Sequence, residues 1–399
     1  MNMLFLVLLA TLSWSPITNA QNCVTLFNNA MRIYKEEPEH AVALLQGVIQ
    51  QEPESLEAHY NTAYILKQTG NFAQALPYYE HVLTKQPGYV HAHIGAAQAH
   101  LAVGNYLQGW QDLEWHLGEP PAYTQEALTY LHSHYSLDNK IILLNAEWGI
   151  GDAIMMARYA QQLKSRGATV IIHLIHQALV PLFKQQPYFD KVIAPQEPSA
   201  LFHFQIPIMS LPMVFETTVK TIPAQGPYIT IDQALIDTWR EPLSHDTNFK
   251  IGICWHGSTI HGEEKFMPLS YFAQLANIPG VSMYSLQRQH GMDQLNNLQD
   301  PTIIKQFDDT FDSIPFLDTA AVMKNLDLVI TVDTSIAHLA GALGVPVWVV
   351  VPHPADWRWM IERNDSPWYP SMKLFRKAKD GNWDMVLNEI QQALSKIMQ

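Results

Sequence analysis

The sequence feature that most constrains the fold is an internal repeat near the start of the chain. Gly70-Asn71-Phe72 recurs as Gly104-Asn105-Tyr106, and Pro53 recurs as Pro87, in each case 34 residues later. Because glycine ends helices and asparagine begins them, each copy is predicted to be a pair of helices that meet at this turn. One such pair cannot bury its own apolar face, so the copies are expected to stack on one another.

A period of 34 residues is that of the tetratricopeptide repeat. The middle copy is the clearest, at about residues 56–89, and is flanked by weaker copies at about 22–55 and 90–117. We therefore predict a domain of about three repeats over residues 21–118. Such repeats either offer a concave surface to a protein partner or act as a spacer against the next domain, and the sequence leaves both interpretations open.

Strands alternating with helices follow the repeats, after a predicted linker at 119–139 that begins with Glu119-Pro120-Pro121. Continuous Val/Ile/Leu strands of this kind form parallel sheets with helices on both faces. The series occurs twice, which predicts an α plus α/β chain with two Rossmann-like halves at 140–245 and 246–399. The expected strands are 140–145, 169–175, 192–193, 205–208, 249–255, 281–286, 328–332 and 345–351, and the clearest helices are 153–164 and 383–397.

Charge and cysteine content exclude two classes of protein. The chain has 24 Lys and Arg against 37 Asp and Glu, and a net charge of -13 argues against a nucleic-acid partner. Its two cysteines, Cys23 and Cys254, provide no disulfide framework, and Cys254 lies in an apolar strand where a core role is expected.

The first twenty residues contain an apolar run, Leu4–Ala10, followed by Thr18-Asn19-Ala20, which resembles the end of an export signal. No Lys or Arg precedes the run, and it is shorter than the ~20 residues that span a bilayer. An export signal or weak anchor and a merely apolar start both remain open. We expect a cytoplasmic or inner-membrane-associated protein, with export as the alternative.

Three polar motifs follow predicted strands, where parallel sheets bind ligands. The first is 145–152, in which Gly149 and Gly151 are expected to let the backbone turn tightly and a ligand approach, and Asp152 stands at a helix start. The second is 333–344. There Thr334 or Ser335 can cap a helix whose first amides bind an anion.

His338 lies one turn into this second motif, on the same side as its cap. The third motif is 255–258 with Lys265 downstream, and its Ser258 hydroxyl and lysine suit a departing diphosphate. Each motif also has a structural interpretation as a capped helix or a solvated loop. A dinucleotide-binding oxidoreductase is disfavoured because Ile154 stands where the third glycine of its fingerprint belongs.

These motifs resemble those of the heptosyltransferase-like glycosyltransferases of family 9, which have the two-Rossmann GT-B architecture. The resemblance rests on Gly151-Asp152 and on the pattern Asp333-Thr334-x-x-x-His338-Leu339-Ala340-x-x-x-Gly344. From about residue 56 to its end, the chain resembles bacterial tetratricopeptide-repeat proteins whose carboxyl half is such a transferase. The strings at 147–152, 354–359 and 365–370 are part of that likeness.

The resemblance implies an inverting transferase that moves a sugar from a nucleoside-diphosphate donor to a hydroxyl of a protein, glycan or lipid-linked acceptor. It implies Asp152 as the general base and no cofactor or metal ion, and the sequence contains no Asp-x-Asp. Ser335 stands where heptosyltransferases usually have glycine. The donor-binding residues implied are Gly149, Gly151, Ser258, Lys265, Asp333, Thr334, Ser335 and His338.

Two questions stay open on the sequence alone. Trp357 and Trp359 either pack on the donor base or belong to the core. The chain as a whole is either an enzyme or a repeat adaptor whose transferase-like half is inactive and only binds ligands or partners.

Overall fold

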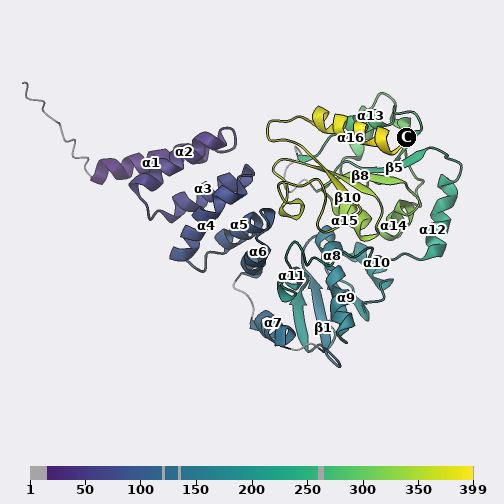
Figure 1. Cartoon of the computed structure of the whole chain (residues 1–399), viewed down its shortest axis with the longest axis horizontal. Helices are drawn as coiled ribbons and strands as arrows, with labels where there is room; N and C mark the ends of the chain where they lie inside the picture. Colours follow the sequence, from purple (N-terminus) through teal and green to yellow (C-terminus); the bar gives the residue numbers. More distant parts are fainter. Residues whose placement is uncertain (1–15, 119–121, 134–135, 259–264, 399) are drawn as a thin grey trace, which may run out of the picture. The chain divides into compact units, whose positions relative to one another are not determined.

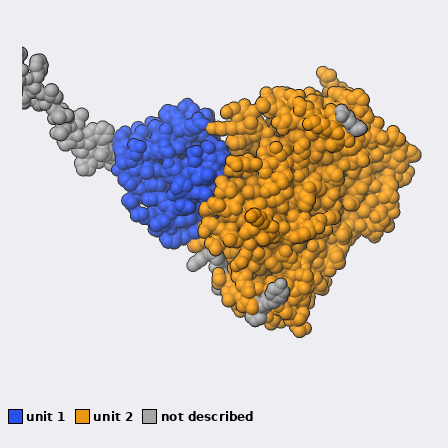
Figure 2. Space-filling model, in the orientation of Figure 1, with its two compact units in different colours: residues 1–99 blue, residues 100–399 orange. Residues whose placement is uncertain are grey.

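The computed structural model describes residues 16–118, 122–133, 136–258 and 265–398. The apolar run at 4–10 and the break at 119–121 lie outside these residues. The chain divides into two compact units, residues 1–99 and 100–399 (Figure 2). This boundary lies within the third predicted repeat, so the second helix of that repeat belongs to the second unit.

The first unit consists of helices arranged in pairs. In the middle repeat, Gly70 has φ 80°, a left-handed conformation that suits glycine, and Ala63, Ala75 and Tyr79 form the buried contact between the two helices. Asn71 stands before the second helix as predicted, although its side chain donates to Thr69 Oγ1 at 3.0 Å and does not cap the helix. The helices are α1 (Pro16–Ile33), α2 (Pro38–Gln51), α3 (Leu56–Gln68), α4 (Phe72–Lys85) and α5 (Val90–Ala102), which crosses the unit boundary.

The second unit contains a four-stranded sheet in its first half. All neighbouring strands are parallel, in the order β3-β2-β1-β4. The strands are β1 (Ile141–Ala146), β2 (Thr169–Leu174), β3 (Lys191–Ile193) and β4 (Phe204–Pro207). The helices that precede or accompany them are α6 (Tyr106–Leu113), α7 (Ala122–Ser133), α8 (Ile150–Met156), α9 (Arg158–Ser165), α10 (Val180–Lys184) and α11 (Leu211–Val214).

Helix α7 occupies much of the segment expected as a linker. It packs on β4, where the rings of Tyr130 and Phe204 lie 4.5 Å apart, and His132 Nε2 lies 2.9 Å from the carbonyl oxygen of Val214. This segment therefore covers an edge of the first sheet.

The second half contains a six-stranded parallel sheet in the order β10-β9-β8-β5-β6-β7, which is the strand order of a Rossmann sheet. The predicted fold class is thus confirmed, although β7 and β10 were not predicted. The strands are β5 (Phe249–Cys254), β6 (Val281–Ser285), β7 (Ile304–Lys305), β8 (Leu328–Val332), β9 (Val347–Val351) and β10 (Met372–Arg376). The helices are α12 (Gln233–Arg240), α13 (Leu269–Leu275), α14 (Leu317–Met323), α15 (Ser335–Ala342) and α16 (Trp383–Ile397).

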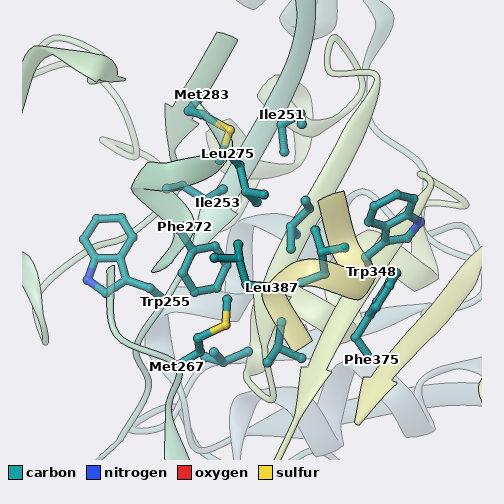
Figure 3. Close-up of a cluster of buried hydrophobic side chains, with 14 of the residues drawn as sticks. Ile251, Ile253, Trp255, Met267, Phe272, Leu275, Met283, Trp348, Phe375 and Leu387 are labelled. Atoms are coloured by element: carbon teal, nitrogen blue, oxygen red, sulfur yellow. The ribbon is translucent and has the colours of Figure 1, made fainter. Parts of the chain in front are cut away.

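Helices α13 and α16 cover one face of this sheet, and α14 and α15 lie on the other (Figure 1). On the first face, Phe272 and Leu387 meet the strand residues Ile251 and Ile253 (Figure 3). Every residue of β8 and β9 is buried, which explains why Thr331 is the one polar residue in the two strands. Cys254 is buried as expected.

The helix expected at 153–164 is broken into α8 and α9. The carbonyl oxygens of Ile154 and Met155 accept hydrogen bonds from Tyr228 Oη at 2.9 Å and from Arg158 Nε at 2.8 Å. In a continuous helix those carbonyls would accept from amides one turn further on. The side chains of Tyr228 and Arg158 therefore account for the break.

None of the helices in the described part of the chain is both long enough and apolar enough to cross a membrane.

Candidate active site

The sheet topology brings the predicted motifs together. In the second sheet the strand order reverses between the neighbours β5 and β8, and ligands bind at such a switch point. The loops after these strands touch, because a Cβ added at Gly257 would lie 2.9 Å from Thr334 Cγ2. In the first sheet the switch point lies between β1 and β4, and the segment with Gly149 and Asp152 follows β1.

Helix α15 begins in the way the sequence predicted. Of the two candidate caps, Thr334 has this role, since its hydroxyl accepts the Ile336 N–H at 3.3 Å, and Ser335 is the first helical residue. A hydroxyl cap leaves the helix start suited to an anion, because the helix dipole and the first amides point the same way.

Asp333 precedes this cap and is placed among charged side chains. Burial and the nearby Asp356 raise the pKa of Asp333 to about 6, whereas the Trp359 indole and the cations of Arg358 and Lys265 act in the opposite direction. Lys265 itself is exposed, as is Ser258. The predicted phosphate-binding lysine therefore lies close enough to the start of α15 to act on Asp333.

The buried amide of Gln287 fixes the loop after β5. Its Oε1 accepts from the N–H groups of Trp255 and His256, both at 2.9 Å. Its Nε2 donates to the carbonyls of His256 at 3.0 Å and His290 at 2.9 Å. Gln287 thus positions the loop that carries Ser258. The sequence analysis missed Gln287 because a single glutamine after a strand belongs to no motif.

Asp152 lies in the first turn of α8, and its Oδ2 accepts the Gly149 N–H at 3.1 Å. Neither glycine adopts the left-handed backbone that favours this residue, since Gly149 has φ -65° at the start of α8 and Gly151 is helical. Gly151 is needed for a close contact, because a Cβ there would lie 2.7 Å from His338 Cδ2. Helices α8 and α15 of the two halves therefore pack directly on each other (Figure 1).

Arg358 pairs with Asp152 across the two halves through Nη2 and Oδ1. The two side chains are only 11% and 15% exposed. Arg358 Nη1 also donates to Asp356 Oδ1 at 2.7 Å, and its guanidinium lies 4.2 Å from the ring centre of Trp357. Burial disfavours the charged guanidinium, but Asp152 and Asp356 outweigh it and raise the pKa of Arg358. No motif in the sequence assigned a role to Arg358.

His338 lies in the contact between the halves. Its Nδ1 lies 2.9 Å from Tyr369 Oη, and its ring stacks on Trp359 with centres 5.3 Å apart. Burial and the cations of Arg358 and Arg158 hold the pKa of His338 well below its ordinary value, so the folded chain carries it uncharged at neutral pH. Trp357 and Trp359 are buried and belong to the core.

Arg158 of α9 also joins the halves. Its buried guanidinium donates to the Trp368 carbonyl at 2.6 Å and to Tyr228 Oη at 3.1 Å, and lies 4.6 Å from the ring centre of Tyr369. Because Tyr369 contacts His338, this buried arginine supports the position of the histidine.

The last repeat helix is part of the same unit. In α6, Trp110 Nε1 donates to the Thr217 carbonyl at 2.8 Å, which is in the first half. The same indole packs edge-on against Trp357 and Trp368 of the second half, at 5.5 and 6.3 Å. Helix α6 therefore contacts both halves.

A buried acid–histidine cluster supports the loop that leads to Asp152. Glu147 accepts the Ile208 N–H at 3.1 Å and lies 3.4 Å from His116 Nε2. Glu114, also buried, accepts from Ser210 Oγ at 2.9 Å. Burial raises the pKa of Glu114 to about 7, with Glu147 adding to the rise and Ser210 and His116 opposing it. Burial disfavours the imidazolium of His116, but Glu147 outweighs it and raises the pKa of His116.

This cluster predicts a pH-dependent effect of Glu114→Gln on stability. Between about pH 4.5 and 7 the folded chain keeps a proton on Glu114 that the unfolded chain has lost. The free energy of unfolding of the wild type therefore falls as pH rises through this window. Because the amide that replaces the carboxyl group does not titrate, the variant should gain stability relative to the wild type, by at most about 3 kcal/mol from pH 4.5 to above 7.

Denaturant unfolding at pH 5 and pH 8, followed by tryptophan fluorescence, measures this difference, since every tryptophan except Trp14 lies in the second unit. Glu126→Gln, at an exposed position on α7, is the matched control and should show the same difference from the wild type at both pH values. An equal response of the two variants would contradict the role assigned to Glu114.

The structure thus brings Gly151, Asp152 and His338 into the contact between the halves, with Gly149 hydrogen-bonded to Asp152 at the start of α8. It places Thr334, which stands between Asp333 and Ser335, against the loop that leads to Ser258. The chain is a helical-repeat protein with a pair of Rossmann-type sheets. Residues 66–108 match the model of the tetratricopeptide repeat, so the predicted repeat family is confirmed.

Among characterised proteins, the chain is similar to protein FlbA of Caulobacter vibrioides, with 23% identity over 287 residues. The alignment covers 66% of this chain and 47% of FlbA, so the chain spans about half the length of this relative. Two solved structures are also similar. A family 9 glycosyl transferase of Veillonella parvula has 15% identity and a TM-score of 0.46, covering 65% of this chain and 90% of the other. The ADP-heptose LPS heptosyltransferase II of E. coli has 13% identity and a TM-score of 0.47, covering 65% and 100%.

Proposed function

We propose that the chain is an inverting glycosyltransferase that uses a nucleoside-diphosphate sugar and transfers the sugar to a hydroxyl group. The observation that carries the proposal is the direct contact between the segment of Asp152 and the second half, where Gly151 lies against His338 of α15 and Asp152 pairs with Arg358 of the turn Trp357–Trp359. A transferase of this kind needs a carboxylate from one lobe beside a diphosphate site of the other.

In the proposed reaction, the acceptor oxygen attacks the anomeric carbon from the face opposite the diphosphate. The new C–O bond forms as the bond to the diphosphate oxygen breaks, and the leaving diphosphate keeps that electron pair. The acceptor proton passes to a carboxylate oxygen of Asp152. The start of α15, the Ser258 hydroxyl and Lys265 are proposed to stabilise the charge that develops on the diphosphate.

Ligand binding tests the donor class before any acceptor is known. A panel of nucleoside diphosphates and their sugars is screened by the melting temperature of the full chain, and hits are titrated by calorimetry. At a hundred times its dissociation constant, a bound nucleotide should stabilise the folded state by about 2.7 kcal/mol. Lys265→Ala should weaken binding about tenfold, since it removes a charge-assisted contact to phosphate.

Lys191→Ala, at an exposed lysine of the other half, is the control and should bind like the wild type. If no nucleotide of the panel binds, the proposed donor class is wrong. If a nucleotide binds but its sugar is neither transferred nor hydrolysed, the inactive-adaptor hypothesis is favoured.

A further inference from the structure

Arg358 faces more negative charge than it can neutralise. The carboxylates of Asp152, Asp356 and Asp333 all act on this one guanidinium, which is almost entirely buried. In such buried surroundings electrostatic interactions are strong, so the energy of the site depends on which carboxylate the guanidinium pairs with.

The two direct carboxylate partners differ in how they are held. Asp356 lies two residues before Arg358, and its Oδ1 also accepts the Arg358 backbone N–H at 3.0 Å. This contact is local and caps the short helical turn Trp357–Trp359. Asp152 belongs to the other half of the unit and meets Arg358 only through the guanidinium. The pair with Asp152 is therefore the contact that can be exchanged without loss of local structure.

The same pair conflicts with the role proposed for Asp152. One carboxylate oxygen accepts from Arg358 and the other accepts the Gly149 N–H. An acceptor hydroxyl that must pass its proton to Asp152 competes with both donors. Arg358 also interacts with Asp333, which directly precedes the start of α15. A guanidinium binds phosphate oxygens in a bidentate manner as well as it binds a carboxylate.

Resting on the proposed function, we infer that Arg358 exchanges partners: it leaves Asp152 for the diphosphate of the donor, and this frees a carboxylate oxygen for the acceptor hydroxyl. Donor binding and availability of the base are then linked by one side chain. Arg358 is a ligand of the diphosphate in this scheme, and Asp152 is its competitor.

The competition predicts an increase in affinity on loss of the carboxylate charge. Among ADP, GDP, UDP, CDP and dTDP, the nucleotide that stabilises the full wild-type chain most is the probe, and its affinity is measured by calorimetry. Asp152→Asn should bind it about three- to tenfold more tightly, and Arg358→Met about tenfold more weakly. In the Arg358→Met background, Asp152→Asn should no longer tighten binding. Arg363→Met, which removes an arginine paired with the exposed Asp365, should leave affinity unchanged.

The double substitution separates exchange from simple repulsion. If Asp152→Asn tightens nucleotide binding both in the wild type and in Arg358→Met, Asp152 only repels the nucleotide, and the inference is overturned. It is also overturned if Asp152→Asn binds the nucleotide with the affinity of the wild type. In either case nucleotide binding by the wild type still supports the proposed donor class. If the wild type binds none of the five nucleotides, both proposals fail. If Arg358→Met does not fold, the doubly substituted chain, with both Asp152→Asn and Arg358→Met, is compared with Asp152→Asn alone. Equal affinities of these two chains for the nucleotide would overturn the inference.

Discussion

Asp152→Asn is expected to lower kcat for sugar transfer by about 10²- to 10⁴-fold in a chain that remains folded. Asparagine keeps one oxygen that can accept the Gly149 N–H, so the start of α8 should be preserved, while its NH2 group replaces the oxygen that accepts from Arg358. It cannot take the acceptor proton, and the step that breaks the acceptor O–H bond then loses its base.

Initial rates of transfer, or of donor hydrolysis where the acceptor is unknown, measure this loss at saturating donor. Asp365→Asn is the matched control, because Asp365 is exposed and pairs with Arg363 in the same half as Arg358. A wild-type rate in Asp152→Asn would show that another group accepts the proton. Since the same variant is expected to bind the nucleotide more tightly, lost turnover with improved binding is the combined signature of the two proposals.

Gly151→Ala is expected to lower both stability and activity. Its new methyl group would lie 2.7 Å from His338 Cδ2, inside van der Waals contact. The His338 ring cannot retreat easily, because it contacts Tyr369 Oη and stacks on Trp359. Overpacking of this kind costs about 1–3 kcal/mol. If α8 shifts to make room, Asp152, the next residue in the sequence, moves with it. A displacement of about 1 Å can lower kcat/KM on the order of a hundredfold.

Denaturant unfolding followed by tryptophan fluorescence, together with kcat/KM, tests this prediction. Gly88→Ala is the control, because a Cβ at Gly88 would meet no atom within 4 Å and the residue lies in the first unit. It should leave the fluorescence transition and the activity unchanged. Normal stability and activity in Gly151→Ala would mean that the two helices can separate without consequence.

The sequence predicted the elements whose signals are local and periodic. The 34-residue repeat, the apolar strands β1, β5, β8 and β9, and the terminal helix all follow from neighbouring residues along the chain. The Thr334 cap is of the same kind, because a hydroxyl directly before a helix makes its contact two residues away. Strand β10 was missed because its sequence, Met372–Arg376, mixes basic and apolar residues.

The sequence predicted only those residues of the site that belong to a sequence motif. Arg358 and Asp152 are separated by 206 residues, and only the packing of the two halves brings them together. Other contacts also join residues that are distant in sequence, such as His116 with Glu147, and Tyr228 with the Ile154 carbonyl at the break between α8 and α9. Gly151 was predicted to allow a tight turn and the close approach of a ligand, and in the structure it allows the close approach of His338; a glycine pattern does not say which neighbour comes close.

The position of Trp110 has a consequence for how chains of this kind can vary in length. A fragment that begins at residue 119 would lack the indole that contacts Trp357 and Trp368 and the imidazole next to Glu147. Natural gain or loss of repeats is therefore expected only upstream of residue 100, and an independently folding fragment with both Rossmann-like halves should retain α6.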